Sequence, residues 1–418
     1  MNVRRRSSAA ALAAIAVLGA ATAPAVAADP SPSPSASPSK PSGLYGTADP
    51  QYDGVWRQSL ALLAQDTAGV VPSPKAVKWL TDQQCANGAF APFRADPAGA
   101  CDAKTMVDTN NTAAAVQALW AVGGHGDVVE DALGWLKSVQ NEDGGWGYSP
   151  GTPSDANSTS VVIGALTATE TDPEDVVKGG KSPYDALLTF ALPCAKDKGA
   201  GAFAFQPDKD GKLLPNADAT AAGVLGSLGK GLVTEAGSGA KSKTATCSDA
   251  DAPTREQAAA NGAAYLADAL AEDGHLVSAL GGSADQPDYG NTADAVVALA
   301  AQGGADRAAE PLAWLKKNAA TWAAESGPAA YAQLIFAAHA TGTDPRDFGG
   351  TDLVAKLNAT GPAPQGTAAK DTATASDEDK AEKDDDSPFG VWWFVGVCLV
   401  FGIGIGFLLS NRNKKQQP

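Results

Sequence analysis

The sequence predicts an all-α protein in which pairs of helices close into a ring, an α/α toroid. One observation is a repeated unit in which a helix end leads through a glycine turn to an aromatic residue, as in Leu136-x3-Gln140-x3-Gly144-x-Trp146. The other is that each unit precedes a helix rich in Ala, Val and Gly, such as the one that opens at Thr159. A helix that is apolar nearly all round must be buried, whereas its partner has one apolar face. This pairing suits a closed ring, because an open solenoid needs polar capping repeats.

Five copies of the unit are expected within one toroid domain over residues 44–360. A separate first helix is expected over residues 53–64, and the aromatic residues after the first two turns are expected to plug the ring. The third copy is looser, and the fifth has lost its glycine turn. In the first four copies the residues after the turn are Phe90, Trp146, Phe203 and Leu276. The fifth copy is recognised by Trp314, a tryptophan in its first helix.

The start of the chain is interpreted as a targeting segment. Residues 1–27 combine a basic start, an apolar run and the A-x-A cleavage site Ala25-Val26-Ala27, which is typical of a secretory signal peptide. Residues 28–43 are rich in Pro and Ser and are expected to form an extended linker.

The end of the chain is interpreted as a membrane anchor. Residues 389–409 carry no charge and are long enough to span a bilayer. Basic residues follow in the tail, 410–418, so the positive-inside rule places the tail in the cytoplasm and the body outside the cell. Residues 361–387 are strongly charged and are expected to form a disordered acidic stalk. The predicted location is the cell membrane, with a single pass.

Charge and cysteine content narrow the possible functions. The net charge of -16 argues against a nucleic-acid partner. Four cysteines lie outside the predicted span, an even number that suits disulfides in an oxidising compartment. Of the three possible pairings we favour Cys85–Cys101 and Cys194–Cys247, because each closes a loop within one region. A metal site is the weaker alternative, because the cysteine spacings are irregular and the three histidines are scattered.

The repeated unit resembles the QW-type motif of squalene and oxidosqualene cyclases. More broadly, residues 52–357 resemble the prenyltransferase/squalene-cyclase superfamily of α/α toroids, which also includes protein prenyltransferase β subunits, complement thioester domains and the cobalamin carriers intrinsic factor and transcobalamin. The resemblance is specific for the fold. It says little about function, because these families share a scaffold and not a chemistry.

The catalytic residues of these enzymes have no clear counterpart in the predicted ring. The strings closest to the Asp-x-Asp-Asp acid of the cyclases lie at 377–379 and 384–386, in the predicted stalk. A thioester Cys-Gly-Glu-Gln segment is absent, and the cysteines suit disulfides better than a zinc site. The sequence therefore leans against an enzyme and predicts no catalytic residue, no metal and no cofactor. Buried carboxylates in the ring would favour a cyclase, and the sequence offers the dispersed Asp108, Asp155 and Asp218.

The leading interpretation is a membrane-anchored extracellular protein that captures a ligand, possibly a corrinoid or similar nutrient, for an importer. It follows from the resemblance to the cobalamin carriers, whose inner helices open with short polar caps that contact the ligand. The expected partners are a small molecule and a surface protein or transporter. The candidate ligand-binding residues lie in the loops and helix starts at one end of the ring: Asn111, Tyr148, Asn157, Phe205, Asp218, Tyr289 and Asn291.

Several alternatives remain open at this point. Asn, Asp, Ser and Thr at helix starts are ordinary N-caps, so each polar candidate has a purely structural explanation. The QW-like repeats also suit a terpene cyclase or prenyltransferase-type enzyme. A surface module that binds a protein or a glycan is the third possibility.

Overall fold

The structure is a computed structural model that describes residues 42–194, 199–237, 246–249, 253–278 and 286–367. The expected signal peptide, nearly all of the linker, most of the stalk, the membrane span and the tail lie outside these residues and stay predictions. Within the described part of the chain, no helix is both long and apolar enough to cross a membrane.

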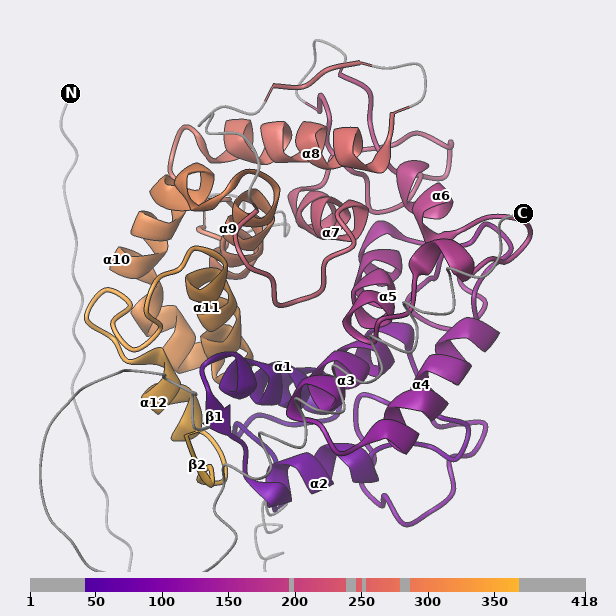
Figure 1. Cartoon of the computed structure of the whole chain (residues 1–418), viewed down its shortest axis with the longest axis vertical. Coiled ribbons are helices and arrows are strands. Elements are labelled where there is room, and N and C mark those ends of the chain that lie inside the picture. The colour runs from indigo at the N-terminus through magenta and orange to yellow at the C-terminus, as the bar shows by residue number, and fades with distance from the viewer. Residues whose placement is uncertain (1–41, 195–198, 238–245, 250–252, 279–285, 368–418) are drawn as a thin grey trace, which may run out of the picture. The chain divides into compact units, whose positions relative to one another are not determined.

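Six helices of the described chain form the inside of a closed ring (Figure 1). Each contacts the next, and the last contacts the first, which closes the ring. These inner helices are α1 (Gly54–Thr67), α3 (Thr109–Val122), α5 (Ala156–Ala168), α7 (Ala217–Ser227), α9 (Tyr289–Gly303) and α11 (Pro328–Ala340). The predicted all-α ring of helix pairs is confirmed.

The outer layer supplies one helix to each pair (Figure 1). Its helices are α2 (Pro74–Asp82), α4 (Gly126–Ser138), α6 (Pro183–Leu188), α8 (Arg255–Leu270), α10 (Ala309–Ser326) and α12 (Leu353–Asn358). Two short 3-10 helices, η1 (Pro173–Asp175) and η2 (Ala305–Ala308), lie in the connections. The pairs α2–α3 to α10–α11 are the five predicted copies, and the two ends of the domain, α12 and α1, add a sixth pair.

Contacts between the chain ends hold this sixth pair together. Strand β1 (Val70–Val71) pairs antiparallel with β2 (Gly366–Thr367). The side-chain amide of Gln65 donates to Asn358 Oδ1 at 2.6 Å. The Tyr45 hydroxyl donates to the carbonyl of Pro362 at 3.2 Å. Residues 361–367, at the start of the segment assigned to the stalk, therefore pack on the ring.

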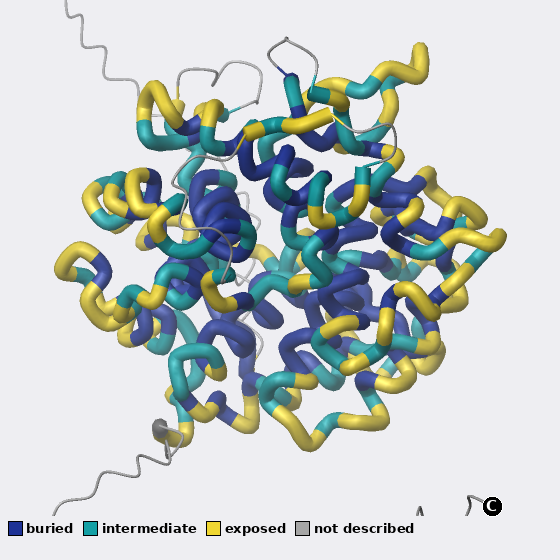
Figure 2. Tube along the Cα trace, turned by 45° about the horizontal axis from the view of Figure 1, so that its top comes forward, coloured by how far each residue is buried: buried dark blue, intermediate teal, exposed yellow. Residues whose placement is uncertain are grey.

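Burial follows the two layers, as Figure 2 shows with buried inner segments and exposed outer ones. Apart from Asn157 in its first turn, helix α5 consists of small and apolar residues, and most of it is buried. Helix α4 buries only Val129, Ala132, Trp135 and Leu136, which share one face. The apolar spacing of each helix thus decides its layer.

The glycine turns tie each outer helix to its inner partner. The residue after the turn donates its backbone N–H to a threonine hydroxyl at 2.9–3.1 Å in four repeats. The pairs are Phe90–Thr112, Trp146–Thr159, Phe203–Thr220 and Leu276–Thr292. Gly88 adopts a left-handed φ of 90°, and a side chain there would collide with the backbone carbonyl of Asp131 in the next outer helix.

The glutamine of the repeated motif connects neighbouring repeats. The Gln84 amide donates to the carbonyl of Gly88 in its own turn and to that of Val128 in the next outer helix, at 3.1 and 2.7 Å. Gln140 makes the equivalent bonds to the carbonyls of Gly144 and Val176, at 2.8 and 2.9 Å. The motif is therefore a structural connector in the first two repeats.

The predicted disulfides are confirmed, with Cα–Cα distances of 5.6 Å for both Cys85–Cys101 and Cys194–Cys247.

Contrary to the prediction from the sequence, the aromatic residues after the first two glycine turns do not plug the ring. Phe90 and Trp146 are fully buried, but neither lines the cavity inside the ring. Trp146 donates its indole N–H to the carbonyl of Leu136 in its own outer helix at 2.8 Å, so it packs between the two layers.

Candidate functional site

The inner helices α3, α5, α7 and α9 all begin with the same polar arrangement. A cap side chain accepts the backbone N–H of the residue three positions on, at 2.7–3.0 Å. The cap residues are Asp108, Asp155, Asn216 and Asp288. These bonds satisfy backbone donors that the first turn of a helix leaves free.

Two of the predicted binding residues belong to these caps. The Asn111 side-chain amide donates to Asp108 Oδ2 at 2.8 Å, and Asn291 does the same with Asp288 Oδ2 at 2.8 Å. Asn111 is also almost completely buried. Both asparagines thus direct their amide donors at a cap carboxylate.

Three other predicted residues lie outside the cavity. Tyr148 is half-exposed at the rim beside Asp108, and Phe205 is half-exposed in the connection between α6 and α7. Tyr289 packs between Trp314 and Trp322, with ring centroids 5.0 and 5.5 Å away. The cavity lining includes none of the three.

The ring encloses a cavity of about 210 Å³ to which all six inner helices contribute. The loop Lys230–Leu232 lines it as well. Most of its wall is apolar, and two aromatic side chains belong to it, Trp56 of α1 and Phe336 of α11. Its polar side chains include Asn110, Asn157, Ser160, Asp218, Asp294 and Gln333.

Asp294 of α9 carries the most perturbed carboxyl group of this site. Burial raises its pKa to about 7, and the negative charges of Asp218 and Asp288 act in the same direction. The Gln333 side-chain amide opposes this by donating to both carboxylate oxygens, at 3.1 and 3.3 Å. The side chain is enclosed by the ring but borders the cavity, so a ligand there can reach it. Near neutral pH this carboxyl is poised between acid and base.

Asp218 of α7, the inner helix beside α9, lines the same cavity and is bound by Asn157 of α5. The Asn157 amide donates to Asp218 Oδ2 at 2.5 Å. Burial is the main cause of the raised pKa of Asp218, and the charge of Asp288 adds to it, while the Asn157 bond lowers it. The structure therefore brings together two predicted residues, Asn157 and Asp218, with an acid that sequence reasoning missed.

The missed residue had a signal in the sequence. Asp294 is the only charged residue between Thr292 and Ala301, a segment predicted to be buried on all sides. An ionisable group in such a helix is costly unless it serves a site. Its partner Gln333, by contrast, comes from α11, and nothing in the sequence links the two positions.

Residues of the cavity wall also carry polar atoms without partners. Asn110 Oδ1, Asn157 Oδ1 and Ser160 Oγ are buried and make no hydrogen bond to any described protein atom. All three residues line the cavity. Buried polar atoms in proteins are normally satisfied, so three unsatisfied ones in the wall of one cavity set this part of the ring apart.

No family model and no curated protein matches this chain. Among solved structures, it is similar to ent-copalyl diphosphate synthase from Streptomyces platensis, with 14% identity, a TM-score of 0.45, and coverage of 69% of this chain and 50% of the synthase. It is also similar to a protein from Actinoplanes, with 17% identity, a TM-score of 0.30, and coverage of 62% and 80%. The chain spans about half the length of the synthase.

The leading interpretation of the sequence, a membrane-anchored protein that captures a corrinoid, is corrected here. The size of the cavity overturns it, because about 210 Å³ is below even the ~300–1,000 Å³ of sites for drug-sized ligands, and a corrinoid is larger than those. The chain has the closed ring of helix pairs of an α/α toroid.

Proposed function

We propose that this protein is an enzyme of the terpene cyclase or prenyltransferase type, which uses acid–base chemistry on an apolar, isoprenoid substrate. The observation that carries the proposal is Asp294, a carboxyl group with a pKa of about 7 in an apolar cavity. A general acid works best when its pKa lies near the operating pH. The neutral amide of Gln333 holds it in place without neutralising it.

In the proposed reaction, protonated Asp294 donates its proton to a carbon–carbon double bond. The Asp294 O–H bond breaks, a C–H bond forms, and the neighbouring carbon becomes positively charged. Trp56 and Phe336 line the same cavity and stabilise that charge by cation–π attraction. Loss of a proton from an adjacent carbon to a cavity carboxylate, Asp294 or Asp218, then forms a new double bond. The ring of helices limits the access of water to the cation.

The proposal includes the location predicted by the sequence. A signal peptide over residues 1–27 and a membrane span over 389–409 would place the protein at a membrane, with the ring outside the cell. An apolar substrate that partitions into lipid is available there. A surface protein that delivers or removes such a molecule is the partner that this arrangement favours.

The test is turnover of defined isoprenoids by the purified full-length chain. Isopentenyl, dimethylallyl, geranyl and neryl diphosphates, short isoprenoids that suit the small cavity, are incubated in deuterium oxide, and extracted products are analysed by mass spectrometry. We expect a product with deuterium at a former double-bond carbon. Asp294→Asn should lower its rate by about 10²–10⁴-fold. The exposed Asp306→Asn serves as the matched control and should leave the rate unchanged. Absence of product from all four compounds, or equal rates in Asp294→Asn and the wild type, would contradict the proposal.

A further inference from the structure

A second hollow lies on the rim of the ring and shares no lining residue with the central cavity. It is an open cleft of about 530 Å³. Residues just before α1, the loop between α2 and α3, and the turn around Tyr148 form its walls. Its volume lies within the ~300–1,000 Å³ of small-molecule sites.

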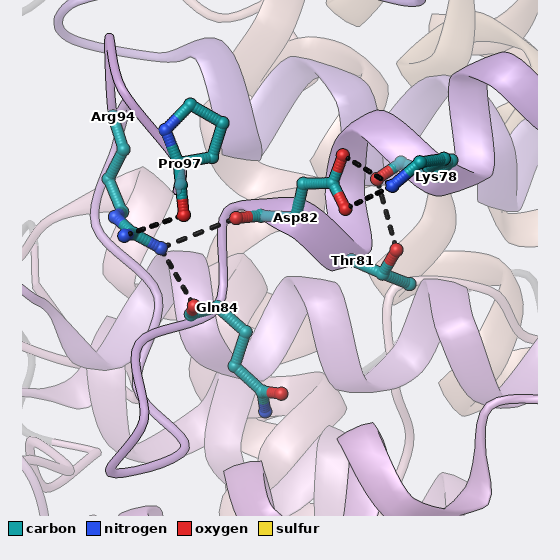
Figure 3. Close-up of polar contacts among 6 residues, drawn as sticks. All are labelled: Lys78, Thr81, Asp82, Gln84, Arg94 and Pro97. Atoms are coloured by element: carbon teal, nitrogen blue, oxygen red, sulfur yellow. Dashed lines mark hydrogen bonds and ion pairs between the residues drawn. The ribbon is translucent and has the colours of Figure 1, made fainter. Parts of the chain in front are cut away.

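The long wall of this cleft is held rigidly. The disulfide Cys85–Cys101 joins the start of the loop to a point further along it, before Lys104. The Arg94 guanidinium is buried and donates to the backbone carbonyls of Asp82, Gln84 and Pro97, at 3.3, 2.8 and 3.0 Å, as Figure 3 shows. It also donates to the carbonyl of Gly99. A wall fixed in this way loses little entropy when a ligand binds.

Large apolar side chains project from the cleft into solvent. Tyr52 is 82% exposed, Met106 is 77% exposed and Tyr148 is 46% exposed. Side chains of this size are usually covered, and a group of them on one surface is typical of a binding site. By contrast, the aromatic rings around Tyr289 cover one another's faces.

The charges in the cleft favour a neutral ligand. Arg94 uses its donors on backbone carbonyls, and the exposed side chains of Lys104 and Asp96 carry opposite charges. The buried carboxylate of Asp108 also borders the cleft, and it accepts hydrogen bonds from Asn111 and Tyr148. Gln51, Thr105 and Ser149 add uncharged hydrogen-bonding groups. A ligand with strong net charge of either sign finds no matching surface here.

We propose that this cleft binds a neutral carbohydrate chain. One face of a sugar ring presents C–H groups with small positive charges, which pack on the negative face of an aromatic ring. Tyr52 and Tyr148 supply such faces, while Gln51 and Ser149 bond to the sugar hydroxyls. Loops that a rigid scaffold presents at one end of a fold are a common place for such a function. This activity is separate from the chemistry proposed for the cavity.

The test is binding of neutral hexasaccharides to the full-length chain by isothermal titration calorimetry. The probes are β-1,4-linked glucose, β-1,4-linked N-acetylglucosamine, α-1,4-linked glucose and α-1,6-linked mannose. We expect at least one to bind, with affinity about tenfold weaker in Tyr52→Ala and in Tyr148→Ala. Tyr148→Phe keeps the ring and should retain most of the affinity. Trp120→Ala removes an equally exposed aromatic side chain outside the cleft and should bind as the wild type does.

Three outcomes would overturn the carbohydrate proposal. They are no binding of any hexasaccharide at millimolar concentration, binding that survives Tyr52→Ala combined with Tyr148→Ala, and displacement of the bound sugar by an unstructured peptide that binds more tightly. Because Tyr52 is 82% exposed, Tyr52→Ala should leave the urea midpoint unchanged, which checks folding. Tyr148→Ala and Tyr148→Phe both lose the hydrogen bond to Asp108, so comparing these two variants isolates the effect of the ring. Asp294→Asn should bind sugar as the wild type does, so failure of the cavity proposal leaves this one testable.

Discussion

Two groups of carboxyl side chains near the starts of the inner helices differ in the groups that donate hydrogen bonds to them. Asp108 and Asp155 are caps that accept backbone N–H groups of their own helices. Asp218 and Asp294 lie in the cavity wall and accept hydrogen bonds from the side-chain amides of Asn157 and Gln333. The cap bonds are part of helix formation, whereas the cavity bonds orient groups toward an enclosed space.

A raised pKa does not separate the two groups. Burial raises the pKa of Asp108 to about 6 even though Asn111 and Tyr148 donate to it, and it raises the pKa of Asp155 as well. The hydrogen-bond partner is the better guide. A carboxylate that accepts backbone N–H groups has a structural role as a helix cap. A carboxylate bound only by side-chain amides inside a cavity has no such role, so it is the better candidate for a functional group.

The largest expected effect is on the pH dependence of stability through Asp294. Its pKa is about 7 in the folded protein and near 3.8 when unfolded. The folded state therefore binds more protons between these values, and its stability should fall as the pH rises from about 4 to about 7, by on the order of a few kcal/mol. Asp294→Asn should remove most of this loss and be the more stable protein at pH 8.

Urea unfolding at pH 5 and pH 8 measures this difference. Asp306→Asn is the matched control and should keep the wild-type pH dependence. Some slope will remain in Asp294→Asn, because Asp108 titrates in the same direction with a pKa of about 6. Identical slopes in Asp294→Asn and the wild type would show that Asp294 is ionised throughout.

A cap carboxylate should behave differently, with a loss of stability at every pH. Asp155 is buried and accepts the Ser158 backbone N–H at 2.7 Å and its hydroxyl at 2.8 Å. Asp155→Ala leaves both donors without that partner and should lower the free energy of unfolding by about 2 kcal/mol. Asp352→Ala removes an exposed cap of α12 and should cost about 0.5–1 kcal/mol. Equal midpoints for the two variants in urea would refute the assigned difference in burial.

The smallest effect concerns the bond between Asn157 and Asp218. That bond lowers the pKa of Asp218, so Asn157→Ala should raise it further. Carboxyl carbon shifts in an NMR titration report the change directly. Asn110→Ala also alters the cavity wall, without removing this bond, and should change the pKa of Asp218 less. A lower pKa in Asn157→Ala would mean that water replaces the amide as a better donor.

Much of the fold was predictable because its determinants are local. The turn from Gln140 to Trp146, the threonine that binds it and the small residues of α5 lie within one stretch of sequence. The disulfides followed from the same locality, because each closes a loop within one region. The helix caps were predictable for the same reason. The sequence did not show which of them bind a ligand, because Asn and Asp at a helix start occur both as ordinary caps and as binding residues.

The site was only half predictable because it is made from residues far apart in sequence. Asn157 and Asp218 were chosen as polar helix starts, and their mutual hydrogen bond follows from ring geometry. Tyr289 fits the same pattern, yet it packs against Trp314 and Trp322 of the outer helix α10. The Asp294–Gln333 pair joins two inner helices, and no periodicity within either one reveals it.

The junction of α12 with α1 has a consequence for the newly synthesised chain. Gln65 and Asn358 are 293 positions apart, and Trp56 and Phe336 reach the cavity from helices on either side of the closing contact between α1 and α11. Contacts of such long sequence separation form late in folding. A nascent chain therefore has no finished cavity until nearly all of the ring has left the ribosome, so the cavity wall would be completed in one step at the end of synthesis.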